Sequence, residues 1–305
     1  MSAVGVAAPG NPLRGAVTGL PALTRQARAK LNLFLRVHGR EAEGHHYLET
    51  LFARLELADT VTGRRAGDSG VTLRVSGAEL GPPEENLAFR AAQAVLGALR
   101  TPFGVELILE KRIPAGAGLG GGSADAGAAL LLVNELAGHA VPRSELLQMA
   151  ARLGADVPFC LSESSLAIAW GHGERIMTLP PLPAAPVLLV CPPVPVSTRE
   201  AYGWLDESRP QPLRRGAVLL DPAALTSWSD IARMAGNDFE SVVFARRPEV
   251  RAAFEALART APLLCRMTGS GSTLFAVYRS EREREDARMM LGRKHGTLIP
   301  TSTVR

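Results

Sequence analysis

The feature that most constrains this chain is a glycine-rich segment between a predicted strand and a predicted helix. Residues 114–132 read PAGAGLGGGSADAGAALLL, with five glycines between positions 116 and 122. Glycine lacks a Cβ, so the backbone there can take positive φ values and approach a bound anion closely. The N–H groups and the dipole of the following helix add partial positive charge. The segment therefore predicts a phosphate-binding loop, with a tight strand-to-helix turn as the simpler alternative.

This segment differs from the commonest ATP-binding loop, GxxxxGK[ST], because no lysine follows its glycines. Ser123 falls on the first turn of the predicted helix, where its hydroxyl could bind a phosphate oxygen or Mg²⁺. We therefore predict a site for ATP and Mg²⁺. Its residues are Pro114, Ala115, Gly116, Ala117, Gly118, Leu119, Gly120, Gly121, Gly122, Ser123 and Ala124.

The composition indicates a soluble globular enzyme and excludes several other classes. Of 305 residues, 46% are hydrophobic and 21% are charged, as in ordinary folded proteins. The 34 basic and 30 acidic residues form no basic block interleaved with aromatics, so nucleic acid is not a predicted partner. No uninterrupted apolar run reaches the length of about 18 residues that a membrane span needs. Three widely spaced cysteines, Cys160, Cys191 and Cys265, fit a reducing cytoplasm.

The hydrophobic periodicity predicts alternating strands and helices in an α+β chain. Residues 1–24 lack such a pattern and are expected to form a disordered extension, and proline-rich residues 180–195 indicate a joint between two domains, 25–180 and 181–305. Residues 47–57 fit either a strand or a short helix. The predicted strands are 30–37, 71–75, 104–111, 166–169, 187–191, 264–267 and 274–277, and the predicted helices are 86–100, 124–136, 143–153, 198–206, 239–245, 248–259 and 281–292.

Two polar segments supply candidates for catalysis. In GADVPF at 154–159, glycine and proline hold Asp156 on a predicted rigid loop, where a carboxylate can accept or orient a hydroxyl proton. Lys30 and Asn32 stand two apart on the first predicted strand, so their side chains share one face. A lysine near the carboxylate could hold an acceptor hydroxyl and stabilise a transferring phosphoryl group. Taken singly, the aspartate could also cap a turn and the lysine could be a solvated charge.

A second glycine-rich segment, MTGSGS at 267–272, lies between two predicted strands. Its glycines allow close approach to a nucleotide or to a substrate phosphate. We expect Thr268, Gly269, Ser270 and Gly271 to contact substrate, although an ordinary hairpin would have a similar sequence.

The four segments are the one with Lys30 and Asn32, the first glycine loop, GADVPF and MTGSGS. Their succession along residues 27–278 resembles the GHMP kinases, named for galacto-, homoserine, mevalonate and phosphomevalonate kinases. The resemblance implies two domains with the active site in the cleft between them. The first is a ribosomal-protein-S5-like ATP-binding domain, and the second is a ferredoxin-like α/β plait. It also implies a small-molecule kinase, expected as a monomer or weak homodimer, in which Lys30 and Asp156 are the catalytic pair.

Further segments are similar to one branch of these enzymes, the 4-diphosphocytidyl-2-C-methyl-D-erythritol kinases. They are residues 29–61, ENLAFRAA at 85–92 and NDFE at 237–240. The similarity implies transfer of phosphate from ATP to the 2-hydroxyl of the cytidylyl-linked methylerythritol, in the non-mevalonate route to isoprenoids. Another GHMP kinase activity, or a ligand-binding protein that kept the fold, remains an alternative.

The same similarity implies roles for individual residues. Asn32 supports the acceptor and Asn86 contacts the nucleotide base. His46 matches a histidine that reads the cytosine edge, and Tyr202 matches an aromatic wall beside it. His45 stands where that branch has a tyrosine. We expect the smaller ring of His45 to stack on cytosine, the alternative being that it faces solvent.

Overall fold

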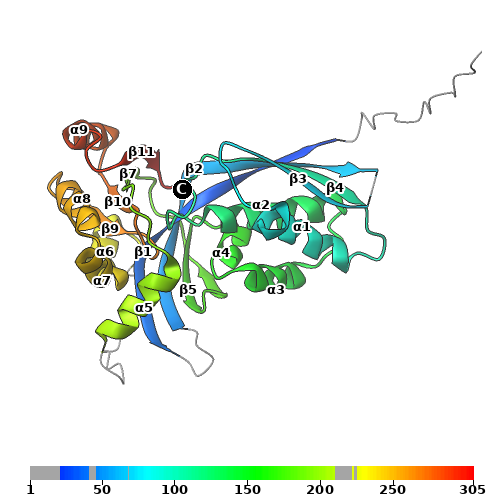
Figure 1. The fold of residues 1–305 in the computed structure, drawn as a ribbon, viewed down its shortest axis with the longest axis horizontal. Helices are drawn as coiled ribbons and strands as arrows, with labels where there is room; N and C mark the ends of the chain where they lie inside the picture. Colours follow the sequence, from blue (N-terminus) through cyan, green and yellow to red (C-terminus); the bar gives the residue numbers. More distant parts are fainter. Residues whose placement is uncertain (1–20, 41–45, 68, 210–221, 223–224) are drawn as a thin grey trace, which may run out of the picture.

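The first two strands are long, antiparallel partners that run through most of the molecule (Figure 1). They are β1 (Leu23–Arg40) and β2 (His46–Ala66). Their register shifts between Arg28 and Lys30 and again between Asn32 and Phe34. Such irregularities bend a strand and re-aim its side chains. The two shifts flank Lys30 and Asn32, the site residues predicted on this strand.

A computed structural model describes residues 21–40, 46–67, 69–209, 222 and 225–305. Within these residues the strands form a seven-stranded and a four-stranded sheet, which lie in a larger and a smaller lobe. Besides β1 and β2, the strands are β3 (Gly70–Ser76), β4 (Gly104–Glu110), β5 (Leu166–Gly171), β6 (Arg175–Thr178), β7 (Pro186–Cys191), β8 (Gly236–Asn237), β9 (Leu264–Met267), β10 (Leu274–Val277) and β11 (Thr297–Ser302). The helices are η1 (Pro83–Glu85), α1 (Leu87–Ala98), α2 (Gly121–Leu136), α3 (Arg143–Leu153), α4 (Val157–Ser162), α5 (Thr198–Ser208), α6 (Trp228–Met234), α7 (Phe239–Arg246), α8 (Pro248–Ala258) and α9 (Glu281–Leu291).

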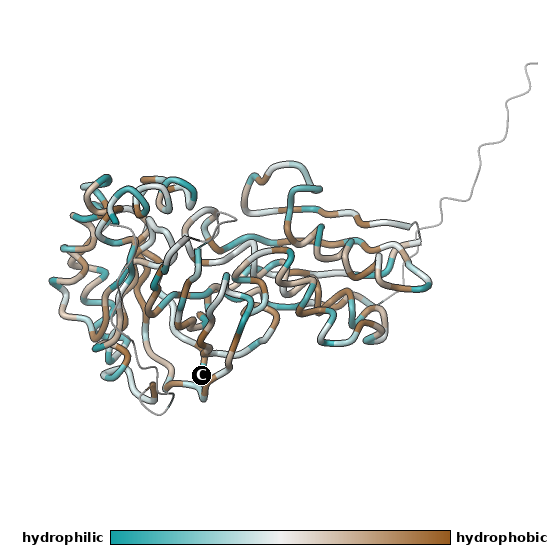
Figure 2. The backbone as a smooth tube through the Cα atoms, turned by 90° about the horizontal axis from the view of Figure 1, so that it is seen from below, coloured by the Kyte–Doolittle hydropathy of each residue, from teal (hydrophilic) through white to brown (hydrophobic). Residues whose placement is uncertain are grey.

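The larger lobe packs helices α1 to α4 against the seven-stranded sheet. Its main strand order is β3-β4-β2-β1-β8, with β5 joined to β2 and β6 joined to β5. Helix α2 is buried on nearly all sides, as its alanine- and leucine-rich sequence predicts. A Cβ on Gly127 would lie 3.0 Å from the backbone of Cys160, so α2 and α4 pack closely at this point. Figure 2 shows hydrophobic stretches running through the helices and strands of both lobes.

The smaller lobe is built from the antiparallel order β11-β7-β10-β9, with helices α5 to α9 around it. This order and the βαββαβ succession correspond to the expected ferredoxin-like plait. The chain crosses between lobes more than once. Strand β8 pairs in parallel with β1, and Thr303 forms a bridge with Leu55 in the larger lobe.

The structure confirms most predicted elements. Residues 47–57, which fit either a strand or a helix, are strand. Two predictions are corrected: β1 already includes residues 23 and 24 of the predicted extension, and the predicted loop after Asp156 is helix α4. Sequence reasoning missed β6, β8, β11 and α6, which are short or carry prolines and polar residues. Residues 1–20 lie outside the described part of the chain. The division at residue 180 stays a prediction.

Among the described residues, no helix combines the length and apolar character that crossing a membrane requires.

Candidate active site

The first glycine loop leads into helix α2, as predicted, but the helix begins at Gly121, three residues before the predicted start at Ala124. Gly116, Gly118 and Gly120 have φ values of 66°, 73° and 69°, a region that side chains rarely adopt. A Cβ on Gly118 would lie 2.5 Å from the carbonyl oxygen of Thr268, and one on Gly120 would lie 2.9 Å from the side chain of Lys30. Backbone conformation therefore favours glycine at all three positions, and close contact with the rest of the site also requires it at Gly118 and Gly120.

The loop lines a cavity of about 320 Å³. All predicted loop residues from Pro114 to Ser123 border this cavity, and Asn86, Leu80 and Leu87 also line it. The Asn86 side chain caps helix α1 by accepting a hydrogen bond from the Ala88 N–H at 2.9 Å. Ala124, the last predicted loop residue, is buried in α2 and does not line the cavity. The cavity therefore lies at a helix start, where the first N–H groups have no partner within the helix, as a phosphate-binding site needs.

Lys30, Asn32 and Asp156 meet beside the loop. The Nζ atom of Lys30 lies 3.1 Å from Oδ2 of Asp156 and donates a hydrogen bond of 2.8 Å to Oδ1 of Asn32. The lysine side chain is 4% exposed and the aspartate side chain 29% exposed. Asp156 is the N-terminal flanking residue of α4, yet its side chain makes no capping hydrogen bond. The carboxylate is therefore directed to the lysine and the cavity rather than used to cap the helix.

Asn32 connects the lysine to the second glycine turn. Its Oδ1 atom also accepts hydrogen bonds from the Gly269 N–H at 2.9 Å and from the Thr268 hydroxyl at 3.3 Å. Its Nδ2 atom donates to the hydroxyl of Thr50 at 2.8 Å. Because the amide is buried and hydrogen-bonded through both its oxygen and its nitrogen, it fixes the position of Lys30.

The second glycine turn, between β9 and β10, lies directly against the first. Asn237 holds it by donating to the carbonyls of Met267 and Gly269, both at 2.8 Å. Ser270 lies 3.1 Å from the Thr198 hydroxyl at the start of α5. A Cβ on Gly271 would lie 2.7 Å from the Met267 sulfur. Gly269 and Ser270 line another cavity, which Lys30 and Asp156 also line, whereas Thr268 is fully buried and does not line it.

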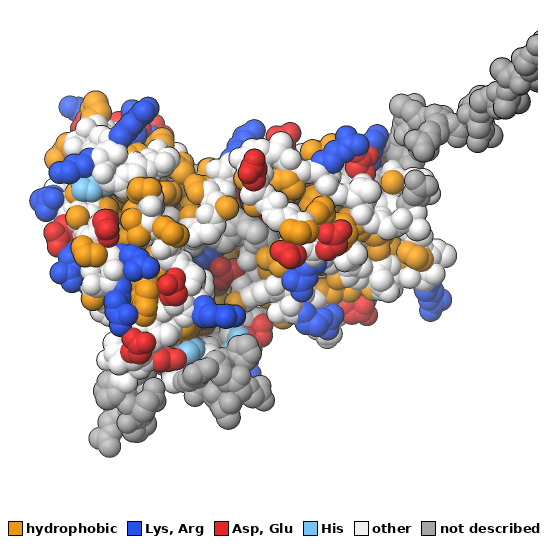
Figure 3. All heavy atoms as spheres, viewed as in Figure 1, with side chains coloured by type: hydrophobic (Ala, Val, Ile, Leu, Met, Phe, Trp, Pro, Cys, Tyr) orange, Lys and Arg blue, Asp and Glu red, His pale blue; other side chains and the backbone are white. Residues whose placement is uncertain are grey.

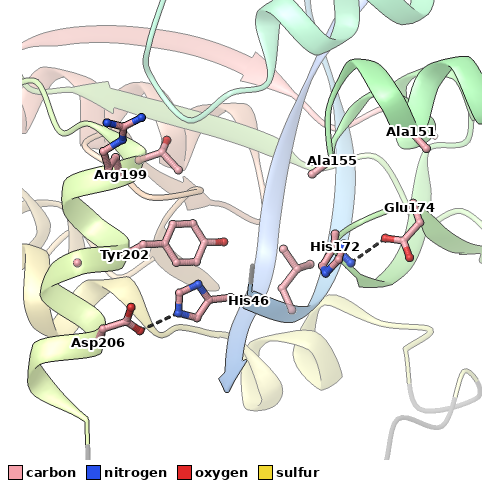
Figure 4. Close-up of a pocket in the computed structure, with 11 residues that line it drawn as sticks. His46, Ala151, Ala155, His172, Glu174, Arg199, Tyr202 and Asp206 are labelled. Carbon is pink, nitrogen blue, oxygen red and sulfur yellow. Dashed lines mark hydrogen bonds and ion pairs between the residues drawn. The ribbon is translucent and has the colours of Figure 1, made fainter. Parts of the chain in front are cut away.

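A larger cavity of about 740 Å³ opens between α5 and the β5–β6 hairpin (Figure 4). His46 and Tyr202 stack on one side of it, with ring centroids 4.7 Å apart and planes 26° apart. Nε2 of His46 lies 2.7 Å from Oδ1 of Asp206. His172 and Glu174 line the opposite side in Figure 4. His45 lies outside the described residues, so its stacking stays a prediction.

These cavities adjoin one another, because neighbouring ones share lining residues. A cavity of about 240 Å³ holds Lys30 and Asp156 and shares Gly118, Gly120 and Ser123 with the loop cavity. It shares Leu48, Ala155, Thr198 and Tyr202 with the larger cavity. Figure 3 shows the surface hollowed between the two lobes. The lysine and the aspartate therefore stand where a ligand of the glycine loop would meet a ligand of the larger cavity.

Sequence reasoning missed a buried charge cluster at the loop cavity, which Lys111 and Asp125 help to line. Nζ of Lys111 lies 2.5 Å from Asp59 and 2.6 Å from Asp125. Burial, opposed by Lys111 and reinforced by Asp59, raises the pKa of Asp125 to about 7. Asp59 also accepts hydrogen bonds from the backbone N–H groups of Arg112 and Ile113. The cluster ties β2, α2 and the segment before the loop together, and its members are too far apart in the sequence to suggest a contact.

Comparison with known proteins identifies the family and the fold. The family described as the GHMP kinases N terminal domain matches residues 86–164, and the GHMP kinases C terminal family matches residues 220–297. Solved structures of a homoserine kinase from Cytophaga hutchinsonii and of a mevalonate kinase share the fold, with TM-scores of 0.66 and 0.67 at 18% and 10% identity. The fold is that of the GHMP kinases, and the chain is a small-molecule kinase.

Relatives with higher sequence identity show to which branch of the GHMP kinases the chain belongs. A 4-diphosphocytidyl-2-C-methyl-D-erythritol kinase from Pelotomaculum thermopropionicum is 37% identical over 90% of this chain and 94% of its own length. A second such kinase, from Moorella thermoacetica, is 37% identical over 93% of this chain and 98% of its own length. The crystal structure of a 4-(cytidine 5'-diphospho)-2C-methyl-D-erythritol kinase covers 93% of this chain and all of its own, with TM-score 0.77 and 34% identity. The chain belongs to the 4-diphosphocytidyl-2-C-methyl-D-erythritol kinase family.

Proposed function

We propose that the protein uses ATP to phosphorylate the 2-hydroxyl of 4-diphosphocytidyl-2-C-methyl-D-erythritol, giving the 2-phosphate and ADP in the methylerythritol phosphate route of isoprenoid biosynthesis. The observation that carries the proposal is the position of Lys30 and Asp156, 3.1 Å apart at the junction of the glycine-loop cavity and the His46/Tyr202 cavity. A phosphoryl donor on one side and a hydroxyl acceptor on the other would meet there.

In this mechanism the glycine loop binds the phosphates of ATP through backbone N–H groups at the start of α2. Asp156 orients the acceptor hydroxyl or takes its proton, and Lys30 stabilises the negative charge of the transferring phosphoryl group. Asn32 holds the lysine through its Oδ1 atom. Since phosphoryl transfer needs little covalent assistance, positioning and charge stabilisation account for most of the catalysis.

Mg²⁺ forms part of the proposal. No group of three or more His, Cys, Asp or Glu side chains among the described residues is arranged to hold a metal by itself. Mg²⁺ commonly needs only one or two protein oxygens, since phosphates and water fill its other positions. The Ser123 hydroxyl and the Asp156 carboxylate line the same cavity and are the side chains that would hold it. Bound there, the ion would neutralise phosphate charge.

The base of the substrate would bind in the larger cavity. A base that is coplanar with His46 and meets its edge would lie nearly parallel to the Tyr202 ring, because the two rings are only 26° apart. Edge recognition and stacking would then act on the same base. The Tyr202 ring is itself supported by Phe239, edge to face at 4.9 Å.

The test is an ADP-release assay with the purified protein, ATP and Mg²⁺. 4-Diphosphocytidyl-2-C-methyl-D-erythritol should be phosphorylated, whereas mevalonate and homoserine should not. Preference for either of these alcohols would replace the proposal with another GHMP kinase activity, and ligand binding without ADP release would identify a binding protein. Its presence in the cytoplasm and its state as a monomer or weak homodimer stay predictions.

A further inference from the structure

Asp206 is the acidic residue in contact with His46. It lies on α5, one turn after Tyr202, and its Oδ1 atom is 2.7 Å from Nε2 of His46. The His46 side chain is 8% exposed and that of Asp206 is 33% exposed. In Figure 4 the imidazole lies beside Asp206, and both residues line the larger cavity. Within the described part of the chain, Nδ1 of His46 has no hydrogen-bond partner.

The contact determines which ring nitrogen of a neutral His46 carries its hydrogen. A carboxylate only accepts hydrogen bonds, and a neutral imidazole has one N–H donor and one bare nitrogen acceptor. A hydrogen bond to Asp206 therefore places the hydrogen on Nε2. Nδ1 becomes an acceptor on the ring edge away from Asp206.

An acceptor at this edge distinguishes two pyrimidines that have nearly the same shape. Position 4 of cytosine carries an amino group, which donates, whereas the same position of uracil carries a carbonyl oxygen, which accepts. An Nδ1 acceptor can pair with the amino group and would repel the carbonyl. The opposite tautomer, with the hydrogen on Nδ1, would reverse this preference.

We propose that Asp206 is a positioning residue that fixes the Nε2–H tautomer of His46 and thereby makes the cavity select cytosine over uracil. The inference rests on the proposed function, in which the larger cavity binds the base. It names a residue on α5, outside the glycine loops and outside the pair formed by Lys30 and Asp156. Its main competitor is a structural role, in which the contact only fastens α5 to β2.

The experiment compares the parent with Asp206→Asn, Asp206→Ala and the control Glu207→Gln. Glu207 is the next residue on α5, exposed and paired with Arg246 rather than with His46. The kcat and KM values are measured with 4-diphosphocytidyl-2-C-methyl-D-erythritol and with its uridylyl analogue. Thermal unfolding of each variant checks that it is folded.

The asparagine amide can donate to Nε2 as well as accept from it, so Nε2–H is no longer enforced and the hydrogen can move to Nδ1. The ratio of cytidylyl to uridylyl kcat/KM should therefore fall by about tenfold or more in Asp206→Asn, mostly through KM, since one polar base contact typically discriminates by at least that factor. In Asp206→Ala it should fall less, and in Glu207→Gln it should not change. An unchanged ratio in both Asp206 variants, or an equal loss with both substrates, would overturn the proposal.

Two readouts do not depend on phosphoryl transfer. Calorimetry with CDP and UDP measures the base preference of the same proteins even if the proposed substrate is not phosphorylated, so failure of the proposed function is distinguished from failure of this inference. Nitrogen-15 NMR of labelled histidine at about pH 8.5 should show the hydrogen of His46 on Nε2 in the parent. Finding it on Nδ1 there would also overturn the proposal.

Discussion

The Nζ atom of Lys30 and the Oδ2 atom of Asp156 lie 3.1 Å apart, although one residue is on β1 and the other precedes α4. The lysine is held from several sides. It donates to Asn32, its ammonium lies 5.4 Å from the centre of the Phe52 ring, and its side chain packs against Gly120. This arrangement pre-organises a cation beside a partly exposed carboxylate, which is a geometry that favours catalysis over stability alone.

The first prediction concerns this carboxylate. Asp156→Asn should lower kcat by about 10²-fold or more and change KM little, because an amide keeps the shape but cannot take or firmly orient the hydroxyl proton. Steady-state kinetics with the cytidylyl substrate measure both constants. Asp286→Asn on the exposed side of α9 is the control. Equal kcat in parent and Asp156→Asn would remove Asp156 from the mechanism.

The second prediction concerns the contact between the two glycine loops. Gly118→Ala should destabilise the protein and reduce ATP-dependent activity, because φ is +73° and the new Cβ would lie 2.5 Å from the Thr268 carbonyl. Gly97 is the matched control, since it lies in α1 and a Cβ there would meet nothing within 4 Å. Gly97→Ala should stabilise by about 0.5–1 kcal/mol through helix propensity. Thermal unfolding compares the two, and a harmless Gly118→Ala would contradict the close packing.

The third prediction concerns the pH dependence of stability. Burial raises the pKa of Asp125 to about 7 in the folded protein from 3.8. The folded state therefore binds more protons than the unfolded state between these values, and the stability from this group is lost as pH rises through about 7. We expect Asp125→Asn to remove this loss of stability, which urea unfolding at pH 5 and pH 8 measures as the free energy of unfolding. The parent should thus lose more stability than the variant between the two pH values, and the reverse order would contradict the direction of the shift.

The sequence predicted those parts of the site that depend on short segments. Periodicity and glycine spacing identified the first loop and the shared face of Lys30 and Asn32, and the family resemblance added His46 and Tyr202. Contacts that depend on tertiary structure were not predictable. Asp125 occurs in an apolar helix with nothing nearby to suggest Lys111 or Asp59, and the pairing of Asp206 with His46 requires α5 to lie beside β2. Short strands such as β8 carry too few residues for a period to be recognised.

The last prediction separates the ring of Tyr202 from its hydroxyl. If the ring provides a stacking surface, Tyr202→Phe should keep KM for the cytidylyl substrate nearly unchanged, whereas Tyr202→Ala should raise KM by about tenfold or more, as loss of base stacking typically does. Burial raises the pKa of Tyr202 to about 12, so the phenol stays neutral and adds no charge near the substrate.

Trp204, on the same helix, is the control for loss of an aromatic ring. It packs against Arg246 and Arg247 and does not line the cavities of the site. Trp204→Ala should therefore leave KM unchanged even if it lowers the melting temperature. Should Tyr202→Phe raise KM as much as Tyr202→Ala, the hydroxyl rather than the ring would bind the substrate. Equal effects of Tyr202→Ala and Trp204→Ala would indicate instead that both residues act only by stabilising α5.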